Sequence, residues 1–147
     1  MHDPVQILLV EDSPGDVRLT QVALKRAEVQ SVLHVARNGE EALEFLKGCL
    51  ETEGAALPDM VLTDLNMPVM GGLELLRHMK EDPNLRRIPV VILSTSDAPR
   101  DIEQSYELNA SCYVRKPVEL DGFLQVMKAI EAFWLSVVRF SSSGVRQ

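Results

Sequence analysis

The sequence predicts a single α/β domain whose five-stranded parallel sheet is doubly wound, with helices on both faces. Short apolar runs alternate five times with longer segments of helical periodicity along 147 residues. Near-continuous apolar runs are typical of parallel strands buried on both faces. Right-handed crossovers then leave few topologies, of which the doubly wound sandwich is the natural one. We expect residues 1–140 to form this domain and the serine-containing residues 141–147 to be a disordered tail.

The strands are predicted from five short apolar segments, each stopped by turn or acidic residues. The first is rich in Val, Ile and Leu and ends at Glu11 and Asp12, which read as a turn at its carboxyl end. The predicted strands are residues 5–10, 32–36, 60–63, 89–93 and 112–114.

A helix is predicted after each strand. Ser13 followed by Pro14 is a favourable start for the first, with a capping residue and then a first-turn proline. The second begins near Glu41 after the Asn38-Gly39 turn, and the third follows Gly71-Gly72. The fourth is expected over about 100–108, and the last over about 119–138.

Polar residues follow four of the predicted strands. They are Glu11 and Asp12, then Asp64, then Ser94, then Lys116. Since ligands of doubly wound sheets bind beyond the carboxyl ends of the strands, we expect these side chains to converge there.

The convergence of three carboxylates predicts a divalent cation. Oxygen ligands without a nearby His or Cys favour Mg²⁺. Such a cation would keep Asp64 ionised, and an ionised aspartate is a competent nucleophile for phosphoryl transfer. Lys116 and Ser94 are suitable donors to the charge that develops on the phosphoryl oxygens.

Four motifs in order carry a resemblance to a known family. They are residues 9–12 (LVED), 64–68 (DLNMP) with 71–72 (GG), 93–94 (LS) and 113–117 (YVRKP). Over roughly residues 5–138 the chain resembles the receiver domain of two-component response regulators. The resemblance implies a flavodoxin-like (βα)5 receiver fold, here with an extended C-terminal helix.

Roles for the acidic residues follow from this resemblance. It implies that Asp64 accepts the phosphoryl group and is a metal ligand. Asp12 would bind Mg²⁺ directly and Glu11 through water, while the backbone carbonyl of Asn66 would complete the protein ligands.

The resemblance also implies roles for the remaining motif residues. Lys116 would contact the phosphoryl oxygens, and Pro117 would follow a cis peptide bond. Ser94 occupies the family's hydroxyl position by spacing, twenty-two residues before Lys116, although its neighbour Thr95 stays an alternative. Tyr113 occupies the aromatic switch position, with a half-buried aromatic of no switching role as the alternative.

Two features suggest a subfamily. The motif EDSPGD at residues 11–16 and the sequence Phe133-Trp134-Leu135 resemble the single-domain, often dimeric regulators that partner bacterial phytochrome kinases. We therefore expect a sensor histidine kinase as partner and a homodimer. Phe133 and Trp134 are candidates for the dimer interface, with ordinary core residues as the alternative.

Composition excludes several other functions. A net charge of −7 without a basic stripe argues against nucleic-acid binding. No apolar run approaches the length of a membrane span, so a cytoplasmic protein is expected. Few residues follow the last predicted helix, so output is expected through an unknown downstream protein. The chain would assist only its own phosphotransfer and hydrolysis, and would not be an enzyme.

Two rival functions stay open. A small phosphatase could use Asp64 as nucleophile, but such enzymes usually place a second aspartate two residues later, where this chain has Asn66. A receiver fold that only scaffolds its partners is the second rival. The intact set of Asp12, Asp64 and Lys116 speaks against it, although each residue alone could be an ordinary turn or loop residue.

Overall fold

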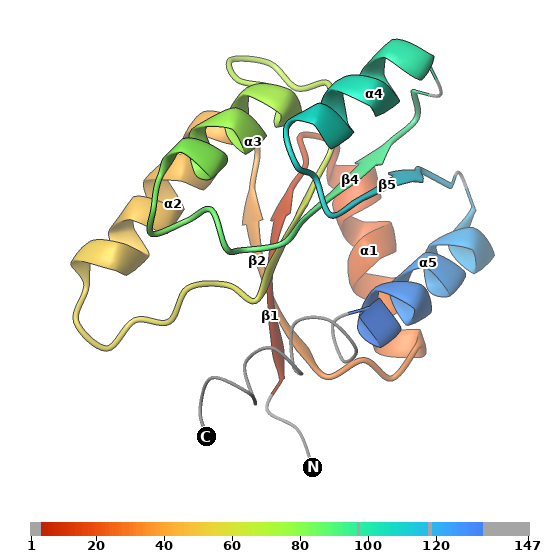
Figure 1. Cartoon of the computed structure of the whole chain (residues 1–147). Coiled ribbons are helices and arrows are strands. Elements are labelled where there is room, and N and C mark those ends of the chain that lie inside the picture. Colours follow the sequence, from red (N-terminus) through yellow and green to blue (C-terminus); the bar gives the residue numbers. More distant parts are fainter. Residues whose placement is uncertain (1–3, 97, 118, 134–147) are drawn as a thin grey trace.

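The computed structural model describes residues 4–96, 98–117 and 119–133, and it has the predicted alternation of strands and helices (Figure 1). The strands are β1 (Val5–Val10), β2 (Ser31–Ala36), β3 (Met60–Thr63), β4 (Val90–Ser94) and β5 (Cys112–Arg115). The helices are α1 (Pro14–Arg26), α2 (Gly39–Glu51), α3 (Gly72–Glu81), α4 (Pro99–Glu107) and α5 (Leu120–Phe133). The expected tail at 141–147 and the expected helical residues after 133, including Trp134, lie outside the described residues.

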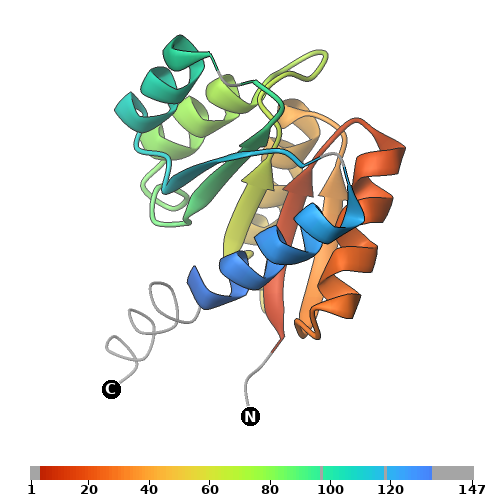
Figure 2. The same ribbon diagram turned by 90° about the vertical axis from the view of Figure 1, so that its right-hand side faces the viewer.

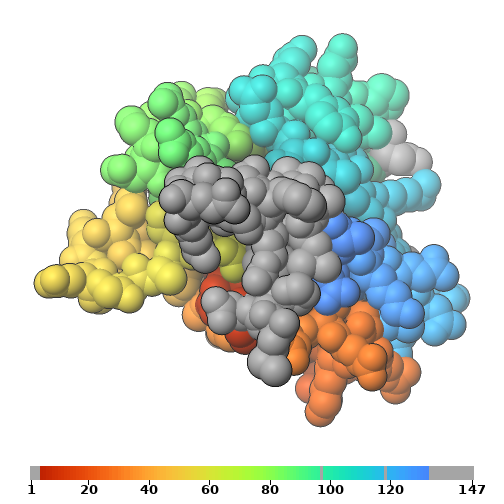
Figure 3. Space-filling model, turned by 60° about the horizontal axis from the view of Figure 1, so that its bottom comes forward, coloured from red at the N-terminus to blue at the C-terminus, as the bar shows by residue number. Residues whose placement is uncertain are grey.

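The five strands form one parallel sheet in the order β2-β1-β3-β4-β5. This is the flavodoxin-like order, in which strands are added on one side of β1 and then on the other, so the switch in strand order lies between β1 and β3. Helices α1 and α5 cover one face, and α2, α3 and α4 cover the other (Figures 1 and 2). Helix α5 packs against α1, and in the space-filling view its blue surface adjoins the orange surface of the N-terminal part of the chain (Figure 3). The predicted doubly wound fold is confirmed.

Alternate residues of each strand supply the two halves of the core. In β1, Ile7 and Leu9 pack toward α1 and α5, whereas Leu8 and Val10 pack toward α2 and α3. All four side chains are buried, which is why the strand reads as a continuous apolar run. The largest residue in the half of the core between the sheet and helices α1 and α5 is Phe123 of α5, which is fully buried.

The helix starts follow local capping chemistry. The Ser13 hydroxyl accepts a hydrogen bond from the backbone N–H of Asp16 at 3.3 Å, with Pro14 as the first helical residue, as the sequence predicts. Helix α2 begins at Gly39, two residues earlier than expected, because Asn38 is its N-cap. Among the described residues, no helix has the length and apolar character that crossing a membrane requires.

Candidate phosphoryl-transfer site

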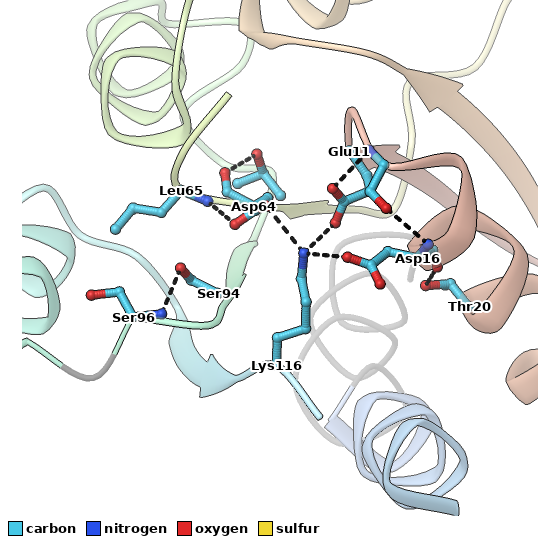
Figure 4. A network of polar contacts seen from close by, with 10 residues as sticks. Glu11, Asp16, Thr20, Asp64, Leu65, Ser94, Ser96 and Lys116 are labelled. Carbon is cyan, nitrogen blue, oxygen red and sulfur yellow. Dashed lines mark hydrogen bonds and ion pairs between the residues drawn. The ribbon is translucent and has the colours of Figure 1, made fainter. Parts of the chain in front are cut away.

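The carboxyl ends of β1, β3, β4 and β5 bring the predicted site residues to one edge of the sheet (Figure 4). Glu11 directly follows β1, Asp64 follows β3, Ser94 ends β4 and Lys116 follows β5. The parallel arrangement places these four side chains together although they are up to 105 residues apart in the sequence. The predicted convergence is therefore present in the fold.

Lys116 is the centre of the polar contacts at this edge. Its side chain is 5% exposed, and its ammonium group donates to Glu11 Oε1 at 2.6 Å and Asp64 Oδ2 at 3.0 Å. A third contact, to Asp16 Oδ2 at 2.9 Å, was not predicted from the sequence. The sequence indicates only that Asp16 lies in the first turn of a helix that starts at the same edge of the sheet, and gives no signal for its partner.

Burial and charge act in opposite directions on the ionisable groups here. Burial disfavours the ammonium of Lys116, but its hydrogen bonds to Glu11, Asp16 and Asp64 outweigh that cost and raise its pKa above the usual value. Burial also raises the pKa of Glu11, and the nearby charge of Asp64 adds to this, while Lys116 opposes both. The site is therefore rich in negative charge, with one ammonium to offset it.

Three carboxylates at this edge form a group that fits a divalent cation. Glu11, Asp12 and Asp64 each offer one oxygen, and these oxygens lie within 4.8 Å of one another. Glu11 is buried, Asp64 is partly exposed and Asp12 is exposed, so the group opens toward solvent. Oxygen donors alone fit a hard cation such as Mg²⁺ or Mn²⁺. Carboxylate oxygens that accept a hydrogen bond keep a second lone pair for a metal.

The loop after β3 explains the second glycine of the motif. The N–H of Gly72 donates to the carbonyl of Leu65 at 2.8 Å, which folds the loop back on itself. A Cβ atom on Gly72 would overlap the carbonyl oxygen of Asp64. Only glycine therefore allows this approach, which fixes the backbone of Asp64.

Hydroxyl groups and a backbone turn make up the other side of the site. Ser94 is fully buried, and its hydroxyl accepts a hydrogen bond from the N–H of Ser96 at 3.2 Å, whereas Thr95 is exposed. The Ser96 hydroxyl donates to Asp101 Oδ2 at 2.6 Å. The Tyr113 hydroxyl donates to the carbonyl of Ser96 at 2.7 Å. The sequence did not indicate Ser96 and Asp101, because short loop contacts of Ser and Asp have no distinctive spacing.

One expectation for this site is wrong. The described residues contain no cis peptide bond, so the bond between Lys116 and Pro117 is trans. The trans preference of an X–Pro bond is only about 0.5–1 kcal/mol, so local sequence does not decide the isomer. With this bond trans, Lys116 makes all three carboxylate contacts.

The residues predicted for a dimer interface are only partly described. Phe133 is the last residue of α5, whose described part ends there, and Trp134 lies outside the described residues. Asn66, expected to offer its backbone carbonyl to a metal, is exposed two residues after Asp64.

Comparison with known proteins identifies the family. Residues 7–128 match the family model of the response regulator receiver domain, and the chain belongs to this family. It is 42% identical over 137 residues to Response regulator Rcp1 of Synechocystis sp., with 93% of each chain covered. The predicted resemblance to the receiver domain of response regulators is thereby confirmed.

Solved structures confirm the predicted resemblance to regulators of the phytochrome-linked type. Phosphorylated cyanobacterial phytochrome response regulator RcpA superposes with a TM-score of 0.82 at 44% identity, covering 91% of this chain and 96% of that one. The Mn²⁺-bound form of Rcp1 has a TM-score of 0.79 at 42% identity, with coverages of 92% and 97%. Bacteriophytochrome response regulator AtBRR has a TM-score of 0.72 at 39% identity, with coverages of 90% and 96%.

Proposed function

We propose that this response regulator is switched by transfer of a phosphoryl group from a sensor histidine kinase to Asp64. The observation that carries the proposal is the placement of Asp64 beside two further carboxylates and 3.0 Å from the ammonium of Lys116. Phosphoryl transfer needs a nucleophilic carboxylate and a positioned positive charge, and Asp64 and the ammonium of Lys116 supply them at the carboxyl ends of the parallel strands.

The transfer step uses groups of this chain. An oxygen of Asp64 attacks the phosphorus of a phosphohistidine, the P–O bond of an acyl phosphate forms, and the P–N bond breaks. The electron pair of that bond leaves with the imidazole, which takes up a proton. Lys116 donates hydrogen bonds to the phosphoryl oxygens, whose negative charge it offsets. Ser94 keeps its own hydroxyl proton while accepting from Ser96, so it can donate to another phosphoryl oxygen.

Mg²⁺ is the proposed cofactor. Glu11, Asp12 and Asp64 would hold it, together with the backbone carbonyl of Asn66. When bound, the cation neutralises negative charge between the carboxylates and the incoming phosphoryl group. The Mn²⁺-bound form of the relative Rcp1 supports a divalent metal at this kind of site.

The switch would pass from Ser94 to Tyr113 through the backbone of Ser96. A hydroxyl drawn toward the phosphoryl group carries the bonded N–H of Ser96 with it. The carbonyl of the same residue holds the Tyr113 hydroxyl at 2.7 Å, so a shift of the loop changes where that ring is held. Phosphorylation would thereby bias one surface toward a protein partner.

The names of the relatives indicate the kinase class. RcpA is described as a cyanobacterial phytochrome response regulator and AtBRR as a bacteriophytochrome response regulator. We infer that a bacteriophytochrome histidine kinase donates the phosphoryl group in the cytoplasm. The output would be phosphorylation-dependent protein binding by a homodimer, with Phe133 and Trp134 in its interface, and without nucleic acid. The chain would act as a switch, not as an enzyme.

Intact-protein mass tests the acceptor. Wild type treated with a small-molecule phosphodonor and Mg²⁺ should gain one phosphoryl mass, and omission of Mg²⁺ should prevent the gain. Asp64→Asn should gain nothing, because an amide is not a nucleophile for this step. Asp121→Asn, which removes an exposed first-turn aspartate of α5, is the matched control and should behave as wild type. A folded wild type that gains no mass would make a phosphorylation-independent scaffold the better explanation.

Transfer from purified kinases tests the partner. An autophosphorylated bacteriophytochrome kinase should phosphorylate this chain at least about 100-fold faster than a histidine kinase with an unrelated sensor. Equal rates from both would contradict the phytochrome partnership while leaving Asp64 as acceptor.

A further inference from the structure

Asp16 is the one partner of Lys116 that the group of metal-binding oxygens does not include. Its Oδ2 lies 2.9 Å from the Lys116 ammonium, and its side chain is 30% exposed. The oxygens that meet within 4.8 Å belong instead to Glu11, Asp12 and Asp64. Asp16 therefore contacts the ammonium group of Lys116 without being a ligand of the predicted metal site.

The first turn of α1 holds Asp16 in place. Its backbone N–H donates to the Ser13 hydroxyl, and its carbonyl accepts from the Thr20 hydroxyl at 2.8 Å. Figure 4 shows its carboxylate turned toward Lys116 from α1, on the side away from Ser94. The contact joins residues 100 positions apart in the sequence, so it depends on the folded helix and sheet.

The hydrogen-bonding capacity of Lys116 is fully used in this state. An ammonium group has three N–H donors, and Lys116 makes contacts with Glu11, Asp16 and Asp64. A phosphoryl oxygen must therefore replace or share one of these acceptors. Glu11 and Asp64 can also act as ligands of a divalent cation. Asp16 is not in that group of carboxylates, so Lys116 is its partner whether or not a cation is bound.

The balance of charges at the site also opposes the capture of a phosphoryl group. Four carboxylates, those of Glu11, Asp12, Asp16 and Asp64, face one ammonium and, when bound, one divalent cation. A phosphoryl group on Asp64 adds further negative charge close to all of them. The charge of Asp16 opposes that addition by direct repulsion and by occupying Lys116.

We propose that Asp16 is a positioning residue that holds Lys116 in competition with the phosphoryl oxygens and so weakens the capture of a phosphoryl group at Asp64. The inference rests on the proposed function of Asp64 as acceptor. Asp16 sets how strongly the site favours its phosphorylated state, without contacting the reacting atoms.

Binding of beryllium fluoride, an analogue of the phosphoryl group, measures this directly. Full-length wild type, Asp16→Asn and Asp16→Glu are titrated by calorimetry at saturating Mg²⁺, with the Mg²⁺ affinity of each variant measured first. Asp16→Asn should bind the analogue about 3- to 10-fold more tightly, as loss of one unit charge near a partly exposed site predicts. Asp16→Glu, which restores the carboxylate, should return the affinity to that of wild type.

The control removes the same charge elsewhere. Glu44→Gln changes an exposed residue of α2 and should leave the affinity unchanged. A role of Asp16 in stability alone predicts the opposite sign, because a loosened α1 would weaken binding. Should Asp16→Asn fail to fold, Asp16→Ala provides a second uncharged residue, since alanine has the highest helix propensity.

The possible outcomes separate the inference from the proposed function. If wild type binds the analogue and both uncharged variants bind it with equal or lower affinity, the role of Asp16 is overturned and Asp64 remains the acceptor. Wild type that binds no analogue at saturating Mg²⁺ overturns both. Tighter binding in the uncharged variants, restored by Asp16→Glu, supports the inference.

Discussion

The two sides of the site are built from different interactions. On one side, which we call the acidic cluster, Glu11, Asp16 and Asp64 contact Lys116, and Asp12 lies beside Glu11 and Asp64. On the other, which we call the hydroxyl network, neutral hydroxyl and backbone groups connect Ser94, Ser96, Asp101 and Tyr113, with the Asp101 carboxylate as the one charged member.

The difference explains how one site can both react and signal. Charge-assisted hydrogen bonds are roughly twice as strong as neutral ones, and those of Lys116 join strand ends that the sheet fixes in place. Neutral hydrogen bonds contribute about 0.5–1.5 kcal/mol each, and those of the hydroxyl network pass through a short loop. The acidic cluster is suited to chemistry at a fixed position, and the hydroxyl network to a change of conformation.

The strongest test of the acidic cluster is Lys116→Met. Phosphorylation should slow by at least about 100-fold, since a preorganised donor to developing charge is lost. Without Mg²⁺, the free energy of unfolding should fall by about 3 kcal/mol, because the buried carboxylate of Glu11 loses its counter-charge. Phosphorylation kinetics and chemical denaturation measure the two effects. Lys128→Met, at an exposed site in α5, should change neither.

Gly72→Ala should disturb the acidic cluster through the backbone. The new Cβ would overlap the carbonyl oxygen of Asp64, so the loop must shift. We expect about 3 kcal/mol lower stability by denaturation, within the range of severe backbone substitutions, and slower phosphorylation. Gly48→Ala provides the control, since a Cβ there meets nothing within 4 Å and the helix should gain about 0.5–1 kcal/mol. Equal stability of both variants would show that the loop has room to relax.

Ser94→Ala tests the start of the hydroxyl network. Phosphorylation should slow by about 10-fold and stability should fall by about 1 kcal/mol, because the N–H of Ser96 loses its acceptor. The exposed Thr95 is the internal control, and Thr95→Ala should change the rate less than about 2-fold. The reverse order of the two rates would assign the hydroxyl role to Thr95.

Tyr113→Phe should have the smallest effect on the chemistry and a selective effect on the switch. Loss of the hydrogen bond to Ser96 should cost about 1 kcal/mol of stability and leave the phosphorylation rate within about 2-fold of wild type. Amide NMR shifts of residues 94–101 should respond less to beryllium fluoride than in wild type. Tyr106→Phe, in α4, gives the comparison for loss of a tyrosine hydrogen bond that does not reach Ser96, because its hydroxyl accepts from the N–H of Tyr113 at 3.3 Å. An unchanged response of the loop in Tyr113→Phe would remove this tyrosine from the switch.

Local sequence was sufficient to predict the elements and most of the candidate site. Buried parallel strands appear as apolar runs, and their polar neighbours Glu11, Asp64, Ser94 and Lys116 had to meet because parallel strands end at one edge. The capping residue Ser13 was equally readable, since it acts on the N–H groups that follow it.

Contacts between side chains of separate elements were not predictable in this way. The contact of Asp16 with Lys116 depends on the direction of α1 relative to β5, and that of Tyr113 with Ser96 on the path of a loop. The isomer before Pro117 was predicted wrongly, because it is set by the surroundings and not by the local sequence.

The sequence by itself determined the order of strands and helices, the receiver family and the acceptor proposed for the phosphoryl group. Hydrophobic periodicity and the residues at strand ends are local properties that can be identified from the sequence alone. Only the tertiary structure decided which groups share Lys116 and how Ser94 connects to Tyr113. Such contacts depend on distances of a few ångströms between elements far apart in the chain, which no spacing along the sequence specifies.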